Sequence, residues 1–180
     1  MLLFFCTASG FFLPLRKGDA IMMENCLDTR KFLLEPVDFY SPGHLKELFP
    51  PDETEEEACL ELPQFNAILS YLKPKGSEMK PSVCKMLSQI PDIEDHNKII
   101  MHLSRESNLL YIAAIEGKDR LLLLNCYPAN EKNDILYYIS MAARQVMFNP
   151  PITVLCSHEQ LGKDETELLE RYFQKVIVAQ

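Results

Sequence analysis

The chain has 180 residues, of which 47% are hydrophobic and 24% are charged. This composition excludes a disordered or fibrous protein and leaves room for one ordinary domain or two small lobes. The net charge of −8 repels phosphate backbones, and no cluster of Lys and Arg forms a basic stripe, so we expect no nucleic-acid partner.

The cysteine usage indicates a reduced, cytoplasmic protein. The six cysteines form no CxxC pair, and Cys126 and Cys156 lie in apolar runs where a thiol packs as a small hydrophobe. The apolar stretch 1–15 has no basic residues before its apolar run, which disfavours a signal peptide. No other stretch approaches the ~20 apolar residues of a membrane span, so we expect no membrane association.

The first half of the chain predicts alternating strands and short helices. Residues 31–39 form a strand candidate, and Pro36 favours a sheet edge or a bulge. Ser41 and Pro42 have the residue types that open a helix. Residues 52–57 hold five carboxylates, which predict a solvated loop; they lack the ligand spacing and the glycine of a calcium site.

A second strand is predicted over residues 65–71 and a short helix over 81–90, followed by a connector at 91–95. These assignments divide the chain into an irregular or non-native N-terminal segment, an incomplete N-terminal lobe and a complete C-terminal lobe. Their expected bounds are residues 1–30, 31–95 and 96–180.

The second half predicts a more regular pattern. Residues 98–103, 109–115 and 120–126 are apolar and are joined by connections of hairpin length, which predicts a three-stranded meander. A helix follows Asn130, where apolar residues recur at three- and four-residue spacing. Residues 152–156 form a continuous apolar strand, typical of a position inside a sheet.

A last helix is expected to be capped by Asp164 with Glu167, and residues 175–179 form the last strand. Crossover connections within one sheet are right-handed, so the final strands should be parallel. The resulting element order is βββαβαβ. This α/β order, with a mixed sheet, is the plan of ribonuclease H-like and actin-like lobes.

Nuclease chemistry on this plan requires carboxylates on the first strand and near the end of the fourth, where they hold two divalent ions. The corresponding residues, 99–103 and 152–156, include no acid. We therefore predict no metal site and no catalytic residues of this type.

Nucleotide chemistry on this plan requires a glycine-rich turn between the first two strands, since backbone amides must approach phosphate oxygens closely. The turn at residues 104–108 has no glycine. Arg105 and Ser107 are the residues that would lie near a phosphate in an alternative interpretation with ATP and Mg²⁺. The simpler interpretation of Arg105 is a solvated hairpin tip.

A thiol or metal site is the third possibility, because Cys156 and His158 lie at the end of the predicted central strand. A Cys-x-His pair is common, and we interpret it as a buried thiol beside a surface histidine. His102, which alternates with apolar neighbours, is interpreted as a satisfied residue of a sheet face.

Residues 31–180 resemble the bacterial domain-of-unknown-function 3822 family. The stretches that carry the resemblance are KFLLEPVDFYS, PQFNAILSY, the run from NKIIMHLSRESNLL to NDILYYI, and the closing ELLERYFQKV. The resemblance implies an actin-like ATPase fold with two related lobes, and it implies no catalytic residues. Because residues 1–28 are too short for a meander of their own, we hypothesise that the first lobe is shortened.

The sequence therefore favours a non-enzymatic binding or scaffold protein on an actin-like fold. We expect no cofactor, and a protein partner or self-association. The alternative is a weak ATP-binding protein or ATPase that uses the cleft between lobes.

Overall fold

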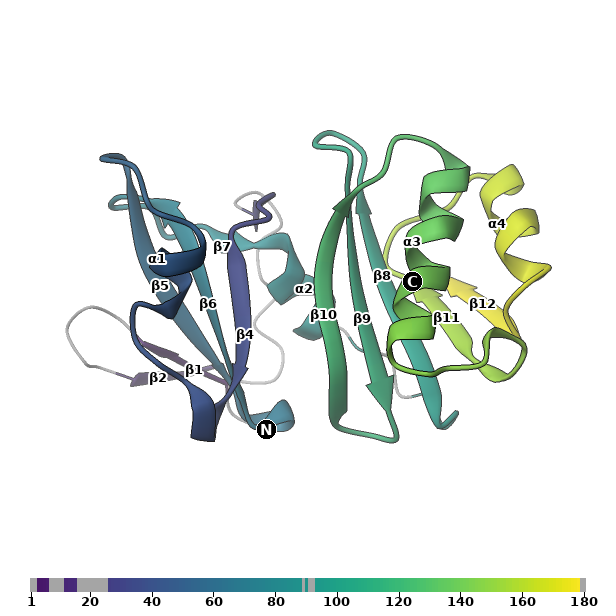
Figure 1. Ribbon diagram of the computed structural model, residues 1–180, viewed down its shortest axis with the longest axis horizontal. Coiled ribbons are helices and arrows are strands. Elements are labelled where there is room, and N and C mark those ends of the chain that lie inside the picture. Colours follow the sequence, from purple (N-terminus) through teal and green to yellow (C-terminus); the bar gives the residue numbers. More distant parts are fainter. Residues whose placement is uncertain (1–2, 7–11, 16–25, 89, 91–92, 179–180) are drawn as a thin grey trace. The chain divides into compact units, whose positions relative to one another are not determined.

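The computed structural model describes residues 3–6, 12–15, 26–88, 90 and 93–178 (Figure 1). The chain divides into two compact units, Met1–Ser82 and Val83–Gln180. The division falls earlier than the expected one at residues 95 and 96. Helix α2 (Ser82–Ser88) thus belongs mainly with the second unit, where its Lys85 lies 3.8 Å from Glu159.

The first unit contains a five-stranded sheet in which every pair is antiparallel. Its order is β2-β1-β5-β6-β4, formed by β2 (Phe12–Leu15), β1 (Leu3–Cys6), β5 (Glu55–Leu62), β6 (Ala67–Pro74) and β4 (Phe32–Pro36). A separate parallel pair joins β3 (Cys26–Leu27) to β7 (Lys80–Pro81). The segment 1–30, which we expect to be irregular, thus includes β1, β2 and β3, and its residues 1–2, 7–11 and 16–25 lie outside the described part.

The predicted edge position of the Pro36 strand is confirmed, since β4 ends the sheet order. A short turn of 3₁₀ helix (Val37–Phe39) follows it, and then helix α1 (His44–Leu48). The predicted helix start at Ser41 and Pro42 is wrong. Gly43 precedes the helix with a φ of 88°, and no side chain caps it. The backbone enters the helix through a left-handed conformation at Gly43, which glycine adopts without steric cost.

The prediction of a loop over the acidic residues is wrong for its second half. Three of the glutamates open strand β5 and pair with lysines at 2.6 to 3.0 Å; the pairs are Lys31–Glu55, Lys46–Glu57 and Lys73–Glu56. The lysines on neighbouring segments compensate the repulsion between these carboxylates, so the glutamates can form part of a strand. Glu55 and Glu57 are accordingly only 19% and 13% exposed in their side chains.

The second unit has the predicted meander, helices and parallel strands (Figure 1). Its sheet order is β10-β9-β8-β11-β12, with β8 (Asn97–Ser104), β9 (Leu109–Glu116) and β10 (Arg120–Pro128) antiparallel. Strand β11 (Val154–Ser157) lies parallel to β8 and to β12 (Lys175–Val178). The predicted mixed sheet and the central place of β11 are confirmed.

Helices α3 (Lys132–Gln145) and α4 (Lys163–Glu170) pack on this sheet. The periodic apolar residues of α3 form one core cluster with side chains of the sheet and of α4, namely Ile135, Ile139, Ala142 and Ala143 with Ile99, Ile112, Leu155 and Leu169. In the part of the chain that the structure describes, no helix is long and apolar enough to cross a membrane.

Candidate functional site

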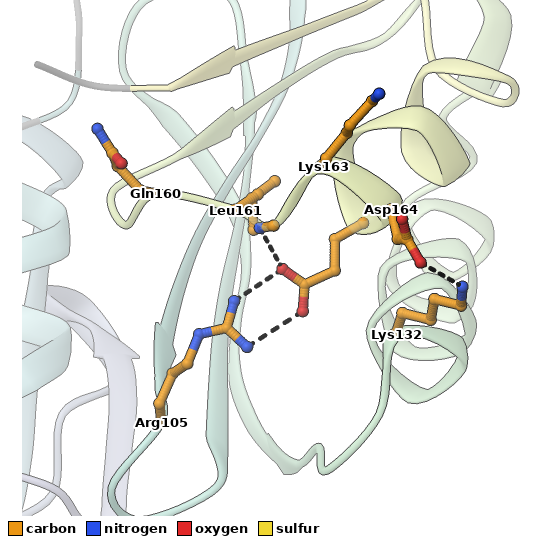
Figure 2. Close-up of a pocket in the computed structure, with 8 residues that line it drawn as sticks. Arg105, Lys132, Gln160, Leu161, Lys163 and Asp164 are labelled. Carbon is orange, nitrogen blue, oxygen red and sulfur yellow. Dashed lines mark hydrogen bonds and ion pairs between the residues drawn. The ribbon is translucent and has the colours of Figure 1, made fainter.

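A shallow, open pocket of about 700 Å³ lies where β8 and β11 end (Figure 2). It is lined by Arg105 from the turn after β8, by residues 160–165 at the start of α4, and by Lys132 at the start of α3. Carboxyl ends of sheet strands are where ligands bind in open α/β folds. The pocket is therefore the candidate site of the second unit.

Arg105 points across the pocket to Glu165, and both of its terminal nitrogens donate to that carboxylate (Figure 2). Nη1 lies 3.1 Å from Oε1 and Nη2 lies 2.7 Å from Oε2. The guanidinium lowers the pKa of Glu165, and Glu165 in turn raises the pKa of Arg105. This two-pronged geometry is the strongest form of a carboxylate–arginine contact.

Glu165 has a second role, which is to begin helix α4. Its Oε2 accepts the backbone N–H of Gly162 at 2.7 Å, so one carboxylate satisfies a free amide before the helix and holds Arg105. The predicted capping pair of Asp164 and Glu167 is wrong. The spacing from Gly162 to Glu165 is the sequence signal that identifies the correct pair.

The other charged residues of the pocket also lie near opposite charges. Lys132 lies 3.3 Å from Asp164, and Lys163 lies 3.8 Å from Glu167. These pairs are exposed to solvent and contribute little to stability. A small anion in the pocket would have to compete with carboxylates that are already present.

Of the two candidate phosphate residues, the structure places Arg105 in the pocket and Ser107 elsewhere in the same turn. Ser107 is exposed and does not line the pocket. The turn also contains Asn108, which has a φ of 54° and occupies the left-handed position that a glycine could take.

A second group of titratable residues surrounds Glu159, just after β11. Its Oε1 lies 3.4 Å from Nδ1 of His102 and 3.8 Å from Nζ of Lys85. His158 lies next to it in the chain, and burial lowers the pKa of His158. No group of three or more His, Cys, Asp or Glu residues in the described ranges could hold a metal ion.

The structure does not support thiol chemistry at Cys156. The residue is fully buried in β11, and burial raises the pKa of its thiol to about 11. A thiol with that pKa is almost entirely protonated at neutral pH, and the thiolate is the reactive form. The interpretation of Cys156 as a buried small hydrophobe is confirmed.

Comparison with solved structures identifies a similar fold. The chain is similar to a protein from Bacteroides thetaiotaomicron VPI-5482 that is described as having an actin-like ATPase fold and unknown function. The TM-score is 0.69 at 16% sequence identity, over 84% of this chain and 66% of the other. This likeness shows an actin-like fold, and the chain spans slightly less than two thirds of that protein.

No curated protein matches the sequence. A family model described as "Protein of unknown function (DUF3822)" matches residues 65–176, which is more than half of the chain. The match begins in the turn before β6 and ends within β12, so it includes every strand and helix of the second unit except the last two residues of β12. The chain belongs to this family of proteins of unknown function.

Proposed function

We propose that this protein is a non-enzymatic binding or scaffold module that acts through protein contacts. The observation that carries the proposal is the contact between Arg105 and Glu165. The one arginine at the pocket that could contact a phosphate already has a carboxylate on both of its terminal nitrogens. A phosphate would have to displace an anion that also begins helix α4.

Two further features support the proposal. The turn between β8 and β9 has no glycine, so side chains stand where backbone amides would have to approach a phosphate. Several large apolar side chains are at least half exposed, with Phe39 at 78% and Met147 at 91%. Exposed apolar side chains that gather on a surface are typical of protein contacts.

The proposal includes a cytoplasmic location. It is supported by the sequence, in which the six cysteines form no CxxC pair, and by Cys156, which packs as a fully buried small hydrophobe in β11. Reduced thiols are usual in the cytoplasm.

A weak ATP-binding protein is the second candidate, because three cationic side chains line the pocket: Arg105, Lys132 and Lys163. The two functions are separated by thermal unfolding with and without ATP and Mg²⁺. A ligand at 100 times its Kd adds about 2.7 kcal/mol to the unfolding free energy, which raises the Tm by several degrees. We expect ATP and Mg²⁺ to leave the Tm of the wild-type chain unchanged.

The matched variant for this experiment is Glu165→Gln, which removes the competing charge and leaves Arg105 in place. A Tm that rises with ATP in the wild-type chain would overturn the scaffold proposal. A rise in the variant alone would show that Glu165 prevents nucleotide binding, as the proposal expects.

A further inference from the structure

Three large apolar side chains are exposed at one end of the second unit. Met147 is 91% exposed, Ile152 is 60% exposed and Tyr172 is 50% exposed. They come from the turn after α3 and the turn after α4. These two turns lie side by side, since the N–H of Gln174 donates hydrogen bonds to the carbonyls of Pro150 and Thr153. Figure 1 shows both turns at the end of the sheet where β11 and β12 begin.

This end of the unit carries positive charge, although the chain has a net charge of −8. Arg144, Arg171 and Lys175 are exposed, and none of them has an ion pair with a described residue. Glu170 is the one acid within residues 144–153 and 170–175. We call these three basic and three apolar residues the basic apolar end.

Met147 also has a strained backbone. Its φ is 58°, in the left-handed region where a residue with a side chain costs roughly 1–2 kcal/mol. Helices commonly end with glycine at this position. Strained backbone positions cluster at functional sites, so the large and almost fully exposed side chain of Met147 suggests a contact with another molecule.

The first unit has an apolar surface segment of the opposite charge. Val37 is 46% exposed, Phe39 is 78% exposed and Leu48 is 53% exposed. Asp38 and Glu47 lie between and beside them, are exposed, and have no ion pair with a described residue. We call these five residues the acidic apolar segment.

The basic residues beside the acidic apolar segment already lie near carboxylates. Lys46 lies 3.0 Å from Glu57, and Nδ1 of His44 lies 2.8 Å from Glu35. The contact between His44 and Glu35 also ties α1 to the end of β4, which holds the two parts of the segment near each other. The segment therefore presents net negative charge.

We propose that the basic apolar end of one molecule binds the acidic apolar segment of a second copy of this chain. The apolar side chains would form the centre of the interface and the opposite charges its rim. Because the two surfaces differ, the contact is head-to-tail and each molecule keeps one free surface of each kind. The inference rests on the proposed function and names a partner for it.

The test is sedimentation velocity of the full chain over a range of concentrations at low and high salt. We expect the mean mass to rise with concentration beyond that of a dimer, and to fall with added salt because salt screens the charged rim. The variant Arg144→Glu/Arg171→Glu should lower the association constant at least about tenfold, since it places like charges together. The variant Asp38→Lys/Glu47→Lys should do the same.

Combining all four substitutions in one chain exchanges the charges of the two surfaces and should restore association. An equimolar mixture of the two double variants should also associate, because each then meets a surface of opposite charge. The matched control is Arg30→Glu/Lys118→Glu, which changes the net charge as much as the first variant but lies outside both surfaces. Circular dichroism of each variant shows whether it is folded.

A monomeric wild-type chain at all concentrations would overturn this inference and leave the proposed function standing. Association that both double variants retain, or that the exchanged charges fail to restore, would also overturn it. A rise in Tm with ATP and Mg²⁺ would count against the proposed function whatever the mass.

Discussion

Arg105 and Glu165 join two segments that are 60 residues apart through two hydrogen bonds of 3.1 and 2.7 Å. The pair connects the turn after β8 to the start of α4, at the end of the sheet where a ligand would bind. The side chain of Glu165 is only 14% exposed, so the contact is partly shielded from water. We therefore expect this contact to stabilise this end of the unit and to compete with anions for Arg105.

We predict that Glu165→Gln lowers the unfolding free energy by about 1–2 kcal/mol, because a charged hydrogen-bonded pair is replaced by a neutral one. Denaturant unfolding at pH 7 measures the change. Glu167→Gln is the matched control, since its side chain is 53% exposed and lies 3.8 Å from Lys163. It should change stability by less than about 0.5 kcal/mol. Equal effects of the two substitutions would contradict the prediction.

The pair of Arg105 and Glu165 also predicts that the unfolding free energy depends on pH. Arg105 lowers the pKa of Glu165, so the stabilisation is complete above the unfolded value of about 4.3 and is lost as the pH falls through the lower folded pKa. The stability difference between the wild-type chain and Glu165→Gln should therefore shrink below about pH 4. Unfolding curves of both proteins from pH 3 to 7 measure this difference, and a constant difference would exclude the linkage.

His44 should titrate above its ordinary pKa of about 6.5. The hydrogen bond to Glu35 is the main cause of the raised pKa, and Glu47 has a smaller effect. The stabilisation from this contact is present below the unfolded pKa and is lost as the pH rises through the folded one. NMR titration should show a larger fall in the His44 pKa for Glu35→Gln than for Glu47→Gln. The reverse order would argue against the contact.

Met147→Gly should stabilise the second unit by about 1 kcal/mol, because glycine adopts a φ of 58° without the steric cost of a Cβ. Met147→Ala keeps a Cβ and should give no such gain. Thermal unfolding at a concentration where the chain is monomeric compares the three proteins. A gain with alanine equal to that with glycine would show that the side chain, and not the backbone, causes the effect.

Cys156 should be among the least reactive thiols of the folded protein. It is fully buried with a pKa of about 11, whereas Cys26 is half-buried. Alkylation by iodoacetamide at pH 8, followed by mass spectrometry, should label Cys26 at least about tenfold faster, since only accessible thiolates react. Rapid labelling of Cys156 without unfolding would contradict the burial of β11.

The fold of the second unit was predictable because its signals are local. Each strand of the meander is an apolar run ended by turn residues, and the buried face of α3 repeats every three to four residues. The handedness of crossover connections then makes β11 and β12 parallel, as the structure confirms. The first unit was less predictable, because its acidic residues enter β5 only when lysines from elsewhere in the chain accompany them.

The candidate site, like the first unit, could be predicted only in part from the sequence. Residue types and spacing named Arg105 only in the alternative interpretation with a phosphate, and they found no acid or glycine pattern for metal or phosphate chemistry. Its partner depends on folding, which brings Glu165 from the start of α4 to within 3 Å of the turn after β8. Periodicity and turn chemistry act over a few neighbouring residues, so they specify elements and their order. Which charges meet is decided by the packing of elements distant in the chain, and here that packing determines whether an arginine is available to a ligand.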